Sequence, residues 1–185
     1  MKILVATEKP FAPAAIEQIR SVAWAEDYEI VLLENYKSVR EFQSAISDAD
    51  ALIVRSDLVT QELLSAAGKL KIVVRAGAGY DNIDLDACTA HGVVAMNTPG
   101  QNSNAVAELV FAMMLYQARG GFSCGTGTEL RGKTLGIHAF GNVGRYVAEI
   151  SRGFGMITYA YDPFVNDNVI VASGAKVCRR AKELY

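Results

Sequence analysis

The chain has 185 residues, of which 51% are hydrophobic, and this length allows one substantial core and part of a second. Its 18 basic and 20 acidic residues are interspersed, without the basic stripe that contacts phosphates along a nucleic acid, so no nucleic-acid partner is expected. No apolar run approaches the length of a membrane span, and the apolar run before Glu8 is too short for a signal peptide. We therefore expect a cytoplasmic protein without a membrane partner.

The cysteines are Cys88, Cys124 and Cys178, and they form no CxxC pair. No histidine stands at ligand spacing from them, which argues against a zinc site and against a disulfide framework. The sequence therefore predicts no metal site, and the cysteines are interpreted as ordinary thiols of a reducing compartment.

Five short apolar runs recur along the first half of the chain. They are rich in valine, isoleucine and leucine and cover residues 3–5, 30–33, 52–54, 72–74 and 93–96. Continuous apolar runs are typical of strands that are buried on both faces. Helical patterns lie between the runs, and this alternation predicts an α/β fold built on a doubly wound parallel sheet with right-handed connections.

Apolar positions at helical spacing define the buried faces that we expect for the first two helices. They are Ile16, Ile19 and Val22 in the first helix, and Val39, Phe42 and Ile46 in the second. The second helix also opens with Ser38 and Glu41 at the spacing of a capping box, a pattern typical of a helix N-terminus.

A longer helix is predicted from Asn102 to the glycines at residues 120–121. Its apolar positions are Val106, Leu109, Val110, Met113 and Met114. The segment GGFSCGTGTE, residues 120–129, has the composition of a linker, and we place a domain boundary there. After it, a strand at 134–138, a helix at 143–152 and a strand at 157–161 form one βαβ unit, with one further short strand expected within 169–178.

The turn between the strand at 134–138 and its helix resembles a dinucleotide fingerprint, G-x-G-x-x-G. Gly141 and Gly144 fit its second and third positions, which allow a phosphate to approach the helix N-terminus and the helix to pack closely. Ala139 occupies the first position, where alanine is expected to need a negative φ. Asp162 follows the next strand and is placed to accept hydrogen bonds from a ribose, which favours NAD over NADP. The alternative is a glycine turn that only packs a helix on a sheet.

A second glycine turn follows the strand at 72–74. Arg75, Gly77 and Gly79 stand at the carboxyl end of this strand, where open α/β sheets bind ligands. Backbone N–H groups in such a turn can bind an anion, and the planar guanidinium of Arg75 suits a carboxylate or a phosphate. A salt bridge that fixes the loop is an equal alternative role for Arg75. Asp84 is expected to cap the helix that follows.

Three segments together resemble one family. RAGAGYDNIDLDAC, HGVVAMNTPGQNSNAVAELV and GTELRGKTLGIHAFGNVGR, in this order, are similar to segments of the NAD-dependent D-isomer-specific 2-hydroxyacid dehydrogenases. The resemblance covers essentially the whole chain. It implies a flavodoxin-like substrate-binding domain at residues 1–101, an interdomain helix at 102–120, and a partial, truncated Rossmann domain that binds NAD at 121–185.

The resemblance also implies roles for individual residues. The small-molecule partner, a 2-hydroxy or 2-oxo acid, would be bordered by Arg55, Arg75, Gly77 and Ala78. The cofactor NAD would contact Ala78, Val106, Phe140, Gly141, Asn142, Val143, Gly144 and Asp162, with the N–H groups of Asn142 and Val143 on the pyrophosphate. For Arg55, pairing with an acid such as Asp57 is the alternative role. Full-length relatives form dimers, and a homodimer is expected here.

No catalytic residue is assigned. In this family an arginine, a glutamate and a histidine serve the reaction, and the resemblance places all of them beyond Tyr185, so the chain alone is expected to be inactive. His91 and His138 match none of them. A phosphorylated substrate is favoured because Arg75 offers a second cationic contact. Glyoxylate, hydroxypyruvate or D-lactate as substrate, or a non-catalytic module that senses NAD or binds a partner, remain the alternatives.

Overall fold

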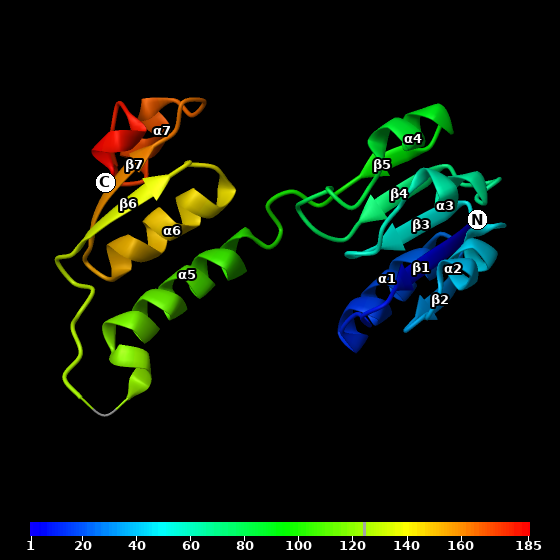
Figure 1. Ribbon diagram of the computed structural model, residues 1–185, viewed down its shortest axis with the longest axis horizontal. Coiled ribbons are helices and arrows are strands. Elements are labelled where there is room, and N and C mark those ends of the chain that lie inside the picture. The colour runs from blue at the N-terminus through cyan, green and yellow to red at the C-terminus, as the bar shows by residue number, and fades with distance from the viewer. Residues whose placement is uncertain (124) are drawn as a thin grey trace. The chain divides into compact units, whose positions relative to one another are not determined.

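The computed structural model describes residues 1–123 and 125–185, and the chain divides into a first unit, Met1–Pro99, and a second unit, Gly100–Tyr185 (Figure 1). The strands of the first unit are β1 (Lys2–Thr7), β2 (Glu29–Glu34), β3 (Ala51–Val54), β4 (Ile72–Arg75) and β5 (Val94–Met96). They form one parallel sheet in the order β2-β1-β3-β4-β5. This order is that of flavodoxin-like folds, so the predicted fold class is confirmed.

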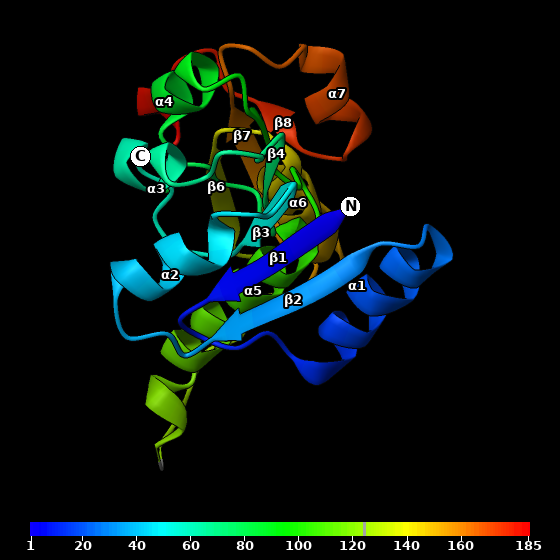
Figure 2. The same cartoon turned by 90° about the vertical axis from the view of Figure 1, so that its right-hand side faces the viewer.

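Helices cover both faces of this sheet. They are α1 (Pro13–Ala25), α2 (Val39–Ile46), α3 (Gln61–Ser65) and α4 (Leu85–Ala90). Figure 2 shows α1 on one side of β1 and β2, and α2 and α3 on the other side. The core is centred on a row of strand residues that lie side by side in register, Leu4, Leu52 and Val73, each with 0% exposure.

The helix starts agree with the sequence better than the helix faces do. Ser38 accepts a hydrogen bond from Glu41 N, so it caps the helix as expected. Glu41 reaches back to Lys37 N, one residue before the N-cap, so the return bond of the capping box is displaced by one residue. Asp84 accepts from Ala87 N, as expected of an N-cap. By contrast, the expected burial of Val22 and Val39 is wrong, because these side chains are 68% and 55% exposed.

The second unit contains a smaller parallel sheet. Its strands are β6 (Thr134–His138), β7 (Ile157–Tyr161) and β8 (Lys176–Val177), paired in the order β6-β7-β8. Its helices are α5 (Ser103–Ala118), α6 (Asn142–Gly153) and α7 (Asp167–Ala172), with short 3-10 turns at Gly120–Phe122 and Ala181–Glu183. The expected βαβ unit and the further short strand are therefore both present.

Helix α5 belongs with the second unit because it packs along α6, and Figure 1 shows α6 between β6 and α5. The rings of Phe111 and Phe154 stack at this contact with centroids 5.0 Å apart. The loop at residues 120–129, whose composition predicts a domain boundary, accordingly lies within the second unit. Among the described residues, no helix has both the length and the apolarity required to span a membrane.

Candidate functional site

The glycine turn of the second unit connects β6 to α6. Gly141 is the N-cap of α6 and has no side chain to cap the helix, so the N–H groups of the first turn are left to bind a ligand. A Cβ built on Gly141 meets no atom within 4 Å, whereas one built on Gly144 would lie 2.5 Å from the carbonyl oxygen of Ala139. The turn is therefore open at Gly141 and closely packed at Gly144, which is the pattern that the fingerprint describes.

Ala139 departs from the expectation. Its φ is 81°, so the expectation that alanine is acceptable here only with a negative φ is wrong. Two contacts explain why the chain adopts this conformation: Ala139 N donates to Tyr161 O at 2.9 Å, and the carbonyl of Ala139 is held against Gly144. A left-handed conformation is strained for any residue with a Cβ, so the turn holds an alanine where glycine would be unstrained.

Asp162, at the end of β7, binds the turn directly. Its Oδ2 accepts from Phe140 N at 2.7 Å, and its Oδ1 accepts from Phe164 N at 2.8 Å and from Val165 N at 3.2 Å. The N–H groups of Phe164 and Phe140 hold the pKa of Asp162 below its ordinary value, because they stabilise the carboxylate. Asp162 is therefore ionised at neutral pH and lies beside the predicted cofactor residues.

The other predicted cofactor residues of the second unit lie in different environments. The side chain of Phe140 is fully buried, so it anchors the turn in the core and offers no surface to a ligand. Asn142 begins α6, and its Nδ2 lies 3.0 Å from the position of a Cβ on Gly100, just before α5. The Asn142 side chain therefore lies close to Gly100, a position where a side chain would have little room. Val143 follows in the first turn of α6, and Val106 is 37% exposed on α5.

The glycine turn of the first unit is covered by Arg75. Arg75 Nε donates to Arg55 O at 2.8 Å, and its Nη1 occupies the space where a Cβ on Gly77 would stand. With the guanidinium in this position, only glycine fits beneath it. The alternative role of Arg75 as a salt-bridge partner receives no support among the described residues, because the bond that orients it goes to a carbonyl oxygen.

Arg55 lies at the same edge of the sheet. Its Nη1 donates to Pro10 O at 3.2 Å, and its guanidinium lies 5.6 Å from the ring centroid of Phe11. Its backbone N–H, at 3.4 Å, is the part of Arg55 that contacts the Asp57 carboxylate, so the guanidinium is not paired with that acid in the described chain. The structure thus brings Arg55, Arg75 and Gly77 together.

Two residues that support the turn were missed from the sequence. Asn97 Nδ2 donates to Ala78 O at 2.7 Å, and Thr98 N donates to Gly77 O at 2.9 Å. Both follow β5, the neighbour of β4 in the sheet. Their position at the carboxyl end of a parallel strand was the available signal, since such ends gather at one edge. They fix the carbonyl groups of the turn and so aim its N–H groups.

A cavity of about 410 Å³ lies near the carboxyl ends of β1 and β3. Asp57, which lines it, is 6% exposed, and its Oδ1 accepts from Glu8 N at 2.7 Å and from Tyr36 Oη at 2.8 Å. Burial and the hydrogen bond to Asp57 raise the pKa of Tyr36 far above its ordinary value. Asp57 therefore acts as an acceptor that ties together the loops after β1, β2 and β3.

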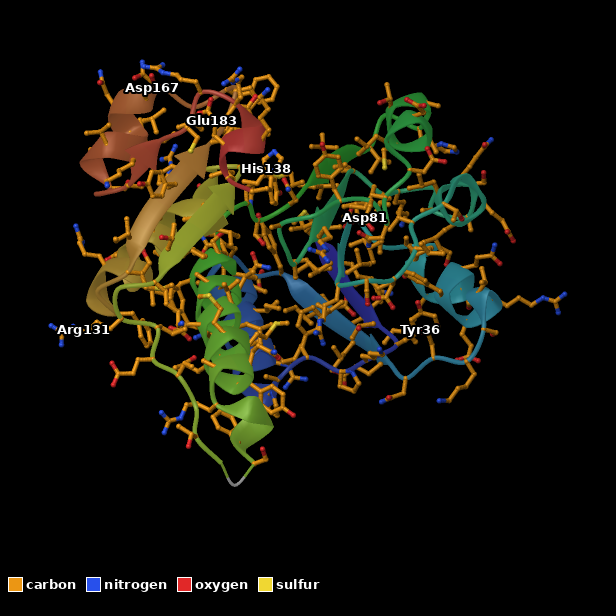
Figure 3. The ribbon with its side chains drawn as sticks, turned by 60° about the vertical axis from the view of Figure 1, so that its left-hand side comes forward. Tyr36, Asp81, Arg131, His138, Asp167 and Glu183 are labelled. Carbon is orange, nitrogen blue, oxygen red and sulfur yellow. The ribbon has the colours of Figure 1, made fainter. Side chains whose placement is uncertain are left out.

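Neither histidine is paired with a carboxylate in the described chain. His91 Nδ1 lies 2.9 Å from Ala87 O at the end of α4, and His138 Nδ1 lies 3.2 Å from Tyr185 Oη. Figure 3 shows His138 at the end of β6. Within residues 1–123 and 125–185, no group of three or more histidine, cysteine, aspartate or glutamate side chains is placed to hold a metal ion.

Several named enzymes are similar to this sequence. It is 47% identical to a 3-phosphoglycerate dehydrogenase of Entamoeba histolytica whose crystal structure contains NAD+, with a TM-score of 0.89 over 100% of this chain and 59% of that one. It is 42% identical over 153 residues to the D-3-phosphoglycerate dehydrogenase of Rattus norvegicus, covering 75% of this chain and 29% of the rat protein. The enzyme of the same name from Mycobacterium tuberculosis is 42% identical over 140 residues, covering 66% of this chain and 26% of that protein.

The chain thus spans 59% of the Entamoeba chain and less than a third of the rat protein. Residues 3–180 match the family described as D-isomer specific 2-hydroxyacid dehydrogenase, catalytic domain. This match includes both glycine turns and Asp162. On this match over nearly its whole length, the chain belongs to the D-isomer specific 2-hydroxyacid dehydrogenases.

Proposed function

We propose that this chain supplies the substrate-binding domain (residues 1–101), the interdomain helix (102–120) and part of the NAD-binding domain (121–185) of an enzyme that oxidises D-3-phosphoglycerate to 3-phosphohydroxypyruvate in serine biosynthesis. The observation that carries the proposal is the match of the whole chain, at 47% identity and a TM-score of 0.89, to an NAD+-bound 3-phosphoglycerate dehydrogenase. The geometry of the two glycine turns supports it.

In the second unit, the N–H groups of Asn142 and Val143 would hold the pyrophosphate of NAD. They lie in the uncapped first turn of α6, and the partial positive charge of a helix N-terminus favours an anion there. Gly141 leaves room for close approach, and Asp162 would accept from the ribose. Val106 and Ala78 would border the nicotinamide.

In the first unit, Arg75 would bind the anionic groups of the substrate. Its Nε is held by Arg55 O, which fixes the plane of the guanidinium while the terminal nitrogens retain further N–H donors. Gly77, Ala78 and Arg55 would complete the border of this site. NAD, when bound, supplies the acceptor for the hydride that leaves C2 of the hydroxy acid.

The substrate test compares phosphorylated and unphosphorylated acids. Binding of D-3-phosphoglycerate, D-lactate and hydroxypyruvate is measured by calorimetric titration on the chain and on its Arg75→Ala variant. The proposal predicts that the phosphorylated acid binds most tightly and loses at least about tenfold in affinity in the variant, since a charge-assisted hydrogen bond contributes about 1.5–3 kcal/mol. Equal binding of all three acids would favour a reductase of another 2-oxo acid.

We further propose that the 185-residue chain binds NAD but does not turn over substrate by itself. Its described histidines have a carbonyl and a phenol as partners, whereas a histidine that moves a proton is usually oriented by a carboxylate. The first experiment is titration with NADH, for which one-to-one micromolar binding is expected. A steady-state assay with D-3-phosphoglycerate and NAD follows, and robust turnover would refute the proposed inactivity.

The proposed assembly is a homodimer in the cytoplasm. Leu109, Met113 and Tyr116 of α5 are 59%, 64% and 54% exposed, and with Phe122 we call them the α5 surface. A hollow of about 590 Å³, which Met113, Tyr116 and Phe122 line together with Ala112 and Gln117, gives a second copy a place to pack. The cytoplasm is proposed because the described cysteines, at positions 88 and 178, are free thiols, as is usual in a reducing compartment, while Cys124 lies outside the described residues.

A further inference from the structure

Two consecutive N–H groups of the glycine turn are held by the end of β7. Ala139 N donates to Tyr161 O at 2.9 Å, and Phe140 N donates to Asp162 Oδ2 at 2.7 Å. The first of these bonds continues the pairing of β6 with β7, whereas the second uses a side chain. Asp162 is therefore the side chain that fixes the turn at the residue directly after Ala139.

The turn needs such a bond because of Ala139. Its φ of 81° lies in the left-handed region, which residues with a Cβ avoid, so the turn would relax if its hydrogen bonds were removed. Relaxation cannot be confined to Ala139, because its carbonyl is packed against Gly144 in the first turn of α6. A shift of the turn would therefore move the N–H groups of Asn142 and Val143.

The same carboxylate also orders the loop after β7. Asp162 Oδ1 accepts from Phe164 N and Val165 N, so its two oxygens join the glycine turn to the following loop. A carboxylate oxygen has two lone pairs, and Oδ2 can accept from a ribose hydroxyl while it holds Phe140 N. Ribose binding and turn fixation are thus compatible roles of one side chain.

We propose that Asp162 is a positioning residue for the pyrophosphate. It acts indirectly, by holding the strained turn at Ala139 and Phe140, and this role is additional to any contact with the ribose. The inference rests on the NAD site proposed above. It predicts that the importance of Asp162 depends on the residue at position 139. A carboxylate that acts on the ribose alone would have the same effect with alanine or glycine there.

The test is a double-mutant cycle with Asp162→Asn, Ala139→Gly and the double variant. An asparagine at position 162 keeps the size of the side chain but places an N–H₂ group against at least one of the backbone donors. In calorimetric titration with NADH, Asp162→Asn is expected to weaken binding by about tenfold or more when Ala139 is present. When it is combined with Ala139→Gly, the loss is expected to be smaller by at least about threefold, and what remains is the loss of any ribose contact. The same loss in both backgrounds would overturn the proposal.

Asp167→Asn is the matched control. Asp167 lies in the same connection and pairs with Arg179, and the proposal predicts unchanged NADH binding for this variant. Circular dichroism confirms that each variant is folded. If Asp162→Asn folds only together with Ala139→Gly, that result also supports the proposal, because the second substitution removes the strain that Asp162 opposes.

A second measurement separates this inference from the proposed NAD site. Without nucleotide, the asparagine oxygen of Asp162→Asn is expected to keep the two donors Phe164 N and Val165 N, which leaves its N–H₂ group against Phe140 N. Hydrogen exchange at Phe140 N is then expected to be at least about tenfold faster, while exchange at the buried Ala160 stays unchanged. Unchanged exchange at Phe140 would overturn the positioning role. If the unsubstituted chain binds no NADH, the NAD site is refuted, and the exchange result still decides whether Asp162 holds the turn.

Discussion

At the scale of single residues, Ala139 is the position where a substitution is expected to stabilise the chain. Glycine adopts a φ of 81° without strain, which favours Ala139→Gly by about 1–2 kcal/mol, and the greater freedom of glycine in the unfolded chain opposes it by about 0.5–1 kcal/mol. The net expectation is a gain of roughly 0.5–1 kcal/mol in the free energy of unfolding, measured by urea denaturation.

The control for this prediction is another alanine of the same unit. Ala148 is buried within α6, so Ala148→Gly is expected to lower the free energy of unfolding by about 1 kcal/mol or more. A loss of stability in Ala139→Gly similar to that in Ala148→Gly would show that position 139 carries no strain.

Residue types and spacing were sufficient to predict Gly141, Gly144 and Asp162 as one group, and the structure places them together. The conformation of Ala139 was not predictable in the same way. It depends on where its carbonyl lies relative to Gly144, further along the chain, and on the bond to Tyr161 from another strand. Motif reading identifies the residues of a turn, but strain is a property of their contacts.

At the scale of secondary structure, the Ser38 cap of α2 is open to a direct test. Ser38→Ala removes the oxygen that accepts from Glu41 N at 3.3 Å and is expected to lower the free energy of unfolding by about 1 kcal/mol. Ser44→Ala on the exposed side of the same helix is the control, and it should be neutral or slightly stabilising because alanine is the better helix former. Equal effects of the two substitutions would show that the cap is unimportant.

Local signals predicted where helices begin but not how they rotate. Ser38 and Asp84 cap helices as expected, because capping involves residues close together in the sequence. Val22 is exposed, although it lies at helical spacing from Ile16 and Ile19, because α1 turns Ala23 towards the core. Which side of a helix is buried depends on its packing partner, and this partner is distant in the sequence.

At the scale of the whole molecule, carboxylates with lowered pKa values set the response to acid. Asp48 is stabilised by Lys2, and Asp162 by the backbone N–H groups of Phe164 and Phe140. A carboxyl group whose pKa is lower in the folded state stabilises above its unfolded pKa of about 4, and this contribution is lost as the pH falls through the folded value. Unfolding free energy should therefore be level near neutral pH and decline below about pH 4.

The decline is measured by urea denaturation at a series of pH values. Asp162→Asn, which cannot titrate, is expected to show a shallower decline than the unsubstituted chain, since one of the groups that take up protons on unfolding is absent. Tyr36 affects the free energy of unfolding at alkaline pH instead. Its raised pKa means that its contribution is present below about pH 10 and is lost as the pH rises further. If Asp162→Asn leaves the decline of stability in acid unaltered, the lowered pKa of Asp162 does not contribute to that decline.

The arrangement of the elements was predictable because strand and helix alternate with little interruption, and right-handed connections then allow few topologies. The sequence did not predict which of the two units contains α5. This helix is apolar on more than one side, so its composition does not indicate which unit it packs against. Its packing along α6 assigns it to the second unit. The same excess of apolar residues leaves the α5 surface exposed.

This surface provides the test of the proposed homodimer. Met113 belongs to this surface and is 64% exposed. Met113→Glu would place a carboxylate between two apolar faces, so the dissociation constant of the dimer is expected to rise at least about tenfold. Val22→Glu, at a 68% exposed position of α1, is the matched control and should leave the association unchanged. Sedimentation equilibrium over a range of concentrations measures both. A dimer that persists in Met113→Glu would show that α5 is not the contact, and an unsubstituted chain that stays monomeric at every concentration would refute the dimer itself.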